Sequence, residues 1–369
     1  MNDHPELAAV GPDSKPISMN MFSSVACPSK KVNLEWFKRA LEWMCDEFKI
    51  EGAQIEVGDY AVCYCDDCNK KRGDKTDNAH FSLEDMVEPY TAAYDVLKKS
   101  DPASWVICET YSSFADPNED DTPGHFGSAF NESQKRQLCG LPADAIIQWA
   151  MDWAVPYKPT QTWPDTVYLP RKNNISRIHH GSQHSMNSID EWAVSTIGDM
   201  VKKSRICGVN GVSIFGEESP ASPPNEANYL VFSEFSGCGT PNPNCDLDLF
   251  FSQTLDPLYG GAGMSKEWRR MYITAHTLRM DIKNNLRLIN ESSMAPFYFH
   301  HNYYEIGEPG LFEKAIGMSP DEKQKLTLKL AHEARSISKE LSGESCRRWA
   351  WLENWLWRAE YIHRTGANG

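Results

Sequence analysis

Three glutamates each follow an apolar stretch of the chain: Glu56, Glu109 and Glu217. Cleavage of a glycosidic bond needs two carboxyl groups. One donates a proton to the leaving oxygen, and the other attacks the anomeric carbon or activates water. A single acidic residue in such a place more often caps the next helix or pairs with a basic side chain. The same position recurs after several stretches, which favours a shared site, so we predict that these three residues are catalytic.

Other polar and aromatic side chains lie close to these positions in the sequence. The chain has 12 Trp and 14 Tyr, and flat aromatic faces pack well against sugar rings, although a tryptophan-rich core is an equal alternative. The residues that we expect to bind substrate are Asp59, Tyr60, Trp149, Asp152, His179, His180 and Glu218.

Three cysteines are crowded into six residues: Cys63, Cys65 and Cys68, with Cys27 as a candidate fourth partner. Four thiolates hold Zn²⁺ tetrahedrally in closed, structural sites. The spacing therefore predicts a structural zinc site, and three free thiols on a loop are the alternative. A catalytic zinc is disfavoured here because no histidine lies near the cluster in the sequence.

The histidines offer a different kind of metal site. His179, His180 and His184 follow a predicted strand, and clustered imidazoles can hold a catalytic metal. Histidines that simply satisfy local hydrogen bonds are the commoner outcome. A histidine-ligated, metal-dependent hydrolase is therefore kept as an alternative.

Helical and apolar stretches alternate along the first two thirds of the chain. Strands are predicted at 52–60, 104–111, 143–153, 174–184 and 208–219, and helices at 32–50, 82–99 and 187–204. This alternation predicts an α/β fold of the (β/α)₈ TIM-barrel type, whose active site lies at the C-terminal ends of the strands. Only five strands are recognised, so either the first strands of the barrel are lacking or the sheet is open. We favour the first.

The last third of the chain is predicted to be helical. Residues 265–290 form one helix, and 319–341 and 343–365 form a hairpin with Gly343 at the turn. We therefore expect a barrel, or its later portion, over residues 1–262 and a C-terminal helical region over 263–369.

Composition excludes some partners. The net charge of −14 repels phosphate backbones, so no nucleic-acid partner is expected. No run of 18 apolar residues is present, so no membrane span is expected. A carbohydrate is the expected partner, and a homo-oligomer is left open.

One segment, IEVGDYAVCYCDDCNKKR at residues 55–72, resembles the β-galactosidases of glycoside hydrolase family 42. In that family an acid/base glutamate is followed by a CYC-x-x-C zinc loop. The resemblance implies that Glu56 is the acid/base and that Cys63, Cys65 and Cys68, with Cys27 upstream, hold a structural zinc. The family has Asn where this chain has Ile55, and the stretch RIHHGSQH, which matches its nucleophile strand, has no carboxylate. The later part resembles α-glucuronidase-type barrels with a helical C-terminal extension.

The leading hypothesis is therefore a glycoside hydrolase that acts on an oligo- or polysaccharide by paired-carboxylate catalysis. A non-catalytic glycan-binding barrel is the main alternative.

Overall fold

The computed structural model describes twelve segments of the chain, which fall into two compact units considered separately below. The described residues are 4–17, 25–56, 62–72, 83–110, 132–150, 173–178, 192–206, 209–214, 221–237, 244–279, 314–315 and 317–365. Unit 1 comprises Met1–Val155, Thr162–Arg177 and Ser204–Ser213, and unit 2 the remainder. The predicted boundary at residue 262 stays a prediction.

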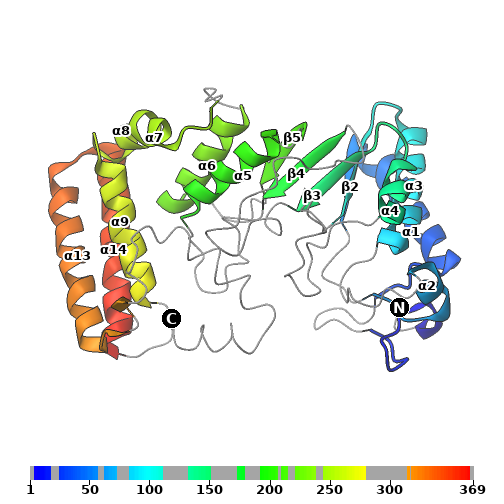
Figure 1. Cartoon of the computed structure of the whole chain (residues 1–369), viewed down its shortest axis with the longest axis horizontal. Coiled ribbons are helices and arrows are strands. Elements are labelled where there is room, and N and C mark those ends of the chain that lie inside the picture. The colour runs from blue at the N-terminus through cyan, green and yellow to red at the C-terminus, as the bar shows by residue number, and fades with distance from the viewer. Residues whose placement is uncertain are drawn as a thin grey trace. The chain divides into compact units, whose positions relative to one another are not determined.

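Unit 1 contains a five-stranded sheet in which the strands lie side by side in chain order (Figure 1). The strands are β1 (Gly52–Ile55), β2 (Trp105–Glu109), β3 (Ile146–Ala150), β4 (Asn174–Ile178) and β5 (Gly211–Ile214). The pairs β1–β2, β2–β3 and β3–β4 are parallel. Four strands in parallel pairs, with a fifth that follows them in chain order, are consistent with part of a (β/α) barrel. The α/β prediction is confirmed.

Helices precede or connect these strands. They are α1 (Lys31–Phe48), α2 (Asp66–Arg72), α3 (Leu83–Ser100), α4 (Glu132–Cys139) and α5 (Val194–Ile206). Helix α3 buries one complete face, on which Leu83, Tyr90 and Leu97 have no exposed surface. Parallel strands need such crossovers, because the chain must return to the same end of the sheet before each new strand.

The two faces of the sheet have different roles. Successive side chains of a strand point to opposite faces, so strand register tells which residues share one. Ser176 belongs to one face, where its Oγ lies 2.7 Å from Oγ of Ser204. Gln54, Glu109 and Arg177 belong to the other face, which carries the polar cluster described below.

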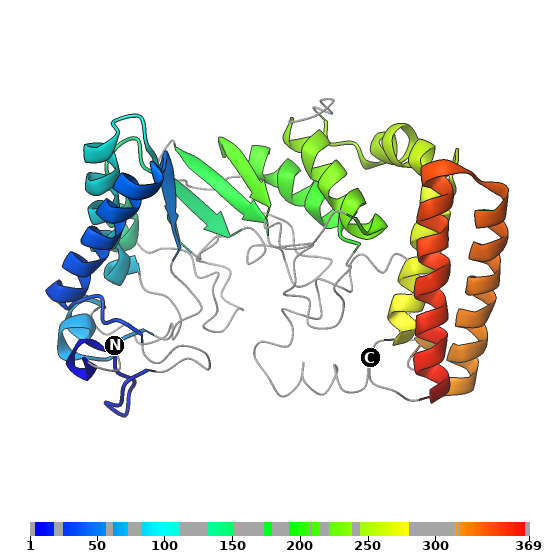
Figure 2. The ribbon, with the colours of Figure 1, turned by 180° about the vertical axis from the view of Figure 1, so that it is seen from behind.

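Unit 2 is helical. Its elements are α6 (Pro223–Ser236), α7 (Leu247–Phe250), the π-helical turn η3 (Phe251–Leu255), α8 (Asp256–Tyr259), α9 (Met264–Arg279), α13 (Pro320–Glu340) and α14 (Gly343–Thr365). Helices α13 and α14 lie side by side (orange and red in Figure 2). A capping box formed by Ser319 and Glu322 starts α13, and Gly343, with φ of 61°, starts α14.

Buried aromatic rings form the core of unit 2. The indole N–H of Trp268 donates to the carbonyl of Arg348, and that of Trp349 donates to the carbonyl of Tyr259. These bonds satisfy the polar atom of each buried ring. The predicted hairpin is confirmed, and α9 ends at Arg279 in the described part of the chain. None of the described helices combines the length and apolar character needed to cross a bilayer.

Candidate functional site

A buried ion pair lies across the C-terminal ends of β2 and β4. Glu109 is the last residue of β2, and its Oε2 lies 2.7 Å from Nη1 of Arg177 on β4. The side chain of Gln54 on β1 donates to the same oxygen at 2.8 Å. Glu109 is 1 % exposed and Arg177 3 %. Three strands therefore contribute to one charged, hydrogen-bonded cluster.

Glu56 joins this cluster from the solvent side. It directly follows β1, its side chain is 44 % exposed, and its Oε2 lies 3.6 Å from the same Nη1 of Arg177. Since the two carboxylate oxygens lie 2.7 and 3.6 Å from one nitrogen, they are at most about 6.3 Å apart, which is below the upper limit of about 9.5 Å for a catalytic carboxylate pair. The structure thus brings together two of the three predicted catalytic residues.

Gln148 on β3 belongs to the same face and is in register with Glu109. It is 1 % exposed, and neither polar atom of its amide has a hydrogen-bond partner in the described structure. Sequence reasoning missed Gln54, Gln148 and Arg177. Their signal was a polar residue inside a predicted strand, and the face that it occupies became known only from the register of the strands.

The remaining predicted substrate-binding residues fall into two groups. Trp149 lies on the opposite face of the sheet, 2 % exposed, and its indole N–H donates to Oδ1 of Asn174 at 3.0 Å. The ring is part of the core there, and its contact with substrate stays a prediction. Outside the described residues lie Glu217, Glu218, Asp59, Tyr60, Asp152, His179, His180 and His184.

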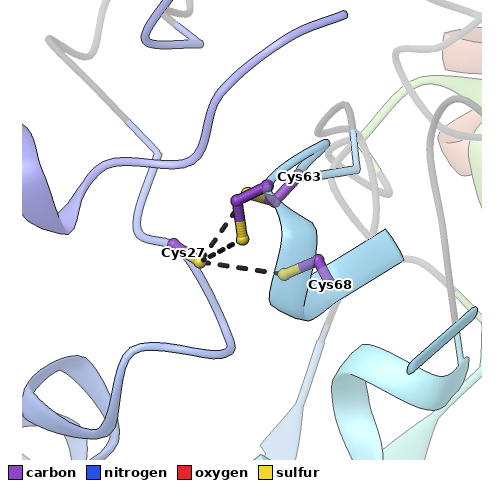
Figure 3. Close-up of side chains that lie close together, drawn as sticks. Cys27, Cys63 and Cys68 are labelled. Carbon is purple, nitrogen blue, oxygen red and sulfur yellow. Dashed lines mark hydrogen bonds between the residues drawn. The ribbon is translucent and has the colours of Figure 1, made fainter. Parts of the chain in front are cut away.

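A second site is formed by four cysteines. The Sγ atoms of Cys27, Cys63, Cys65 and Cys68 all lie within 4.8 Å of one another. Cys27 is central, with its Sγ at 3.6 Å from that of Cys63 and at 3.7 Å from those of Cys65 and Cys68 (Figure 3). A regular tetrahedron of sulfurs around a zinc ion at about 2.3 Å has edges of about 3.8 Å. The four residues could therefore hold a metal ion.

Local structure explains why these cysteines meet. Cys27 follows a short antiparallel pairing between Ala8 and Ala26. Cys63 lies just before α2, where its Sγ accepts the backbone N–H of Val10 at 3.4 Å. Cys68 lies within α2 and is wholly buried. Backbone pairing thus brings the N-terminal segment against the start of this helix.

An arginine supports the cluster from α2. Arg72 donates to the carbonyl of Cys63 and forms a buried 2.7 Å ion pair with Asp85 on α3. Burial raises the pKa of the Asp85 carboxyl, and the Arg72 guanidinium opposes that shift. The pair therefore fixes the loop that carries Cys63 to a helix of unit 1.

The thiols affect one another's ionisation. Hydrogen bonds from Cys27 and Cys68 lower the pKa of the Cys63 thiol, whereas the contact with Cys63 raises that of Cys27 to about 12. The neighbouring thiols thus stabilise one thiolate. Several thiolates this close together repel one another, so a cation among them is needed to stabilise all of them. This donor set fits a thiophilic metal ion.

Comparisons with known proteins give a structural likeness. No protein-family model matches the chain, and no curated protein matches it either. Among solved structures, a mutant of the O-GlcNAc hydrolase of Thermobaculum terrenum is similar to it, with 12 % sequence identity and a TM-score of 0.41. The match covers 95 % of this chain and 80 % of that one.

Proposed function

We propose that the chain is a glycoside hydrolase in which Glu56 is the general acid/base. The observation that carries the proposal is the convergence of Glu56 and Glu109 on one nitrogen of Arg177, at the C-terminal ends of neighbouring parallel strands. That edge of the sheet is where barrel enzymes place their chemistry. The proposed substrate is an oligo- or polysaccharide.

The exposed fractions of the two glutamates assign them different tasks. Glu56 is partly exposed, so it can exchange protons with a bound sugar and with water. Glu109 is 1 % exposed, which supports a positioning role: its carboxylate fixes the Arg177 guanidinium, and Arg177 in turn orients Glu56. Glu217, which follows β5 in the sequence, is the proposed second catalytic carboxylate.

The cysteine cluster supports the same proposal. The resemblance to the family 42 β-galactosidases rests on the segment that holds both Glu56 and Cys63-x-Cys65-x-x-Cys68, and it implied a further ligand at Cys27. In the structure the Sγ of Cys27 lies among the other three. We propose that the bound ion is zinc and that it ties the N-terminal segment to the chain that follows Glu56.

Kinetic assays on matched glutamine variants test the proposal. With a panel of aryl glycosides and oligosaccharides as substrates, we expect Glu56→Gln to lower kcat by ~10³-fold or more without altering the melting temperature. Glu109→Gln is expected to lower both kcat and stability, because it removes the charge that holds Arg177. Glu35→Gln, on the exposed surface of α1, is the matched control and should match the wild type.

Three outcomes would count against these assignments. Unchanged turnover in Glu56→Gln would remove this residue from the mechanism. Loss of turnover in Glu109→Gln at unchanged stability would make Glu109 a direct participant. Tight oligosaccharide binding by the wild type, with no hydrolysis of any substrate, would favour the non-catalytic glycan-binding barrel.

A further inference from the structure

The buried amide of Gln148 lacks hydrogen-bond partners among the described residues. Gln148 lies within β3 and is 1 % exposed. Neither its Nε2 nor its Oε1 is bonded within the segments that the structure describes. A buried amide in this state costs free energy, because both atoms have lost the water that would bond them. A ligand group that brings a donor and an acceptor to this amide would recover that cost.

Strand register places this amide in the candidate site. Gln148 is paired with Glu109 in the parallel register of β2 and β3, so the two side chains leave the same face of the sheet. Ile55 is paired with Cys108, so Glu56, the next residue along the chain, lies in the same row as Glu109. Because neighbouring strands are about 4.8 Å apart, the backbones of Glu56 and Gln148 are separated by about 10 Å. One bound sugar can therefore contact both side chains.

Two other amides of the sheet do have partners. The side chain of Gln54 donates to Oε2 of Glu109 at 2.8 Å. On the opposite face, Oδ1 of the buried Asn174 accepts the indole N–H of Trp149 at 3.0 Å. Gln148 differs from both, because it is buried while its hydrogen-bonding atoms are unused in the described structure. This is the state expected of a group whose partner belongs to a ligand.

The charges beside the amide favour a neutral partner. Nη1 of Arg177 lies 3.6 Å from Glu56 and 2.7 Å from Glu109. When all three groups are ionised, two negative charges face one positive charge, so this cluster repels a ligand carboxylate or phosphate. An uncharged amide both donates and accepts hydrogen bonds, and so does a hydroxyl. A sugar hydroxyl can therefore pair with Gln148 without adding charge to the site.

We propose that Gln148 binds a hydroxyl group of a neutral sugar in the subsite beside Glu56. The inference rests on the proposed glycoside hydrolase function, and it adds a binding residue and a preference for neutral sugars over uronic acids and sugar phosphates. The amide transfers no proton, and it bonds the hydroxyl equally in the ground state and in the transition state. Its removal should therefore weaken substrate binding and leave the chemical step almost unchanged.

Steady-state kinetics of Gln148→Met test the proposal, because Met is close to Gln in size but lacks the amide. With the aryl glycoside that the wild type hydrolyses fastest, we expect KM to rise about 10- to 100-fold and kcat to change by less than about 3-fold. The melting temperature without ligand should stay the same or rise, because an apolar group replaces an unpaired polar one. Gln137→Met, at a half-buried glutamine of α4, is the matched control and should keep the wild-type KM.

Deoxy substrates identify the contact. The probes are monodeoxy forms of the same aryl glycoside, each of which lacks one hydroxyl. For the wild type, one of them should have a KM about 10- to 100-fold above that of the parent glycoside. For Gln148→Met, that analogue and the parent should differ by less than about 3-fold, because the partner of the missing hydroxyl is gone. The corresponding aryl uronide should have a kcat/KM at least about 10-fold below that of the neutral glycoside.

Three results would overturn the inference. The first is an unchanged KM in Gln148→Met, which together with a lower melting temperature would mean that a buried water pairs the amide. The second is an equal KM of the wild type for every monodeoxy analogue, a measurement that needs no variant. The third is faster turnover of the uronide, which would overturn the neutral sugar.

Calorimetry with oligosaccharides separates this inference from the proposed function. If the wild type hydrolyses no substrate but binds an oligosaccharide, and Gln148→Met weakens that binding by about 10-fold or more, the binding role of Gln148 is supported and hydrolysis is refuted. If the wild type neither hydrolyses nor binds any member of the panel, both proposals fail. If hydrolysis is observed with an unchanged KM in Gln148→Met, only the role of Gln148 fails.

Discussion

Removal of the Arg177 guanidinium should destabilise unit 1 severely. In Arg177→Met, Glu109 keeps its carboxylate at a site that is 1 % exposed but loses the cation at 2.7 Å. At an effective dielectric constant of about 20, the lost attraction is about 6 kcal/mol before solvation is counted. Removing one partner of a buried ion pair typically costs about 3–5 kcal/mol, because the other charge stays buried.

A double variant separates the ion pair from the packing. For a unit of this size, a loss of about 3–5 kcal/mol lowers the melting temperature by roughly 6–20 °C. In Glu109→Leu/Arg177→Met both charges are replaced by apolar groups, so most of that loss should be recovered. The assay is urea unfolding followed by circular dichroism, with Lys38→Met on the surface of α1 as the control. A loss below about 1 kcal/mol in Arg177→Met would refute the reasoning.

Three other perturbations test the metal site, the sheet and the helical unit. Cys27→Ser should abolish stoichiometric metal binding, measured by elemental analysis, and lower the melting temperature, whereas Cys139→Ser should do neither. Gly52→Ala should cost at least about 2 kcal/mol in urea unfolding, because its Cβ would overlap the ring and carbonyl of Trp105. Although burial raises the pKa of the Asp256 carboxyl, hydrogen bonds led by that from Ser265 outweigh it, and the pKa lies below its ordinary value. That stabilisation is present above the ordinary carboxyl pKa and is lost as the pH falls through the lowered pKa. In urea unfolding, Asp256→Asn should therefore lower the free energy of unfolding by about 1–3 kcal/mol at pH 7 and by progressively less below about pH 4. A loss that does not depend on pH would contradict this.

The order of elements could be read from the sequence because it depends on local patterns. All five strands were predicted from short apolar runs bounded by turn residues, and each prediction contains or overlaps the observed strand. The hairpin of α13 and α14 was predicted from its 3.6-residue periodicity and from Gly343. Helix α2 was missed because six of its seven residues, DDCNKKR, are polar and carry no apolar stripe. Contacts of Cys68 and Arg72 hold it instead.

The candidate site could be predicted only in part. Glu56 and Glu109 were recognised because carboxylates at strand ends are conspicuous. Arg177 and Gln54 were missed because a polar residue inside a strand gives no sign of which face it occupies until the register is known. The exposure of Trp36 and Trp43 was also hidden, since the sequence pattern shows that both residues are apolar but not which side of the helix packs against α3.

The strand order of unit 1 has a consequence for how the chain acquires its structure during synthesis. Strand β2 pairs with β1, β3 with β2 and β4 with β3. When each of these strands leaves the ribosome, the strand with which it pairs has therefore already been synthesised. Pairing each strand with its predecessor in the sequence keeps the loop to be closed shorter than pairing with a more distant strand would, so the loop-closure cost is lower. Glu56, Glu109 and Arg177 would then be brought together one after another, so the charged cluster is complete only once β4 has joined the sheet.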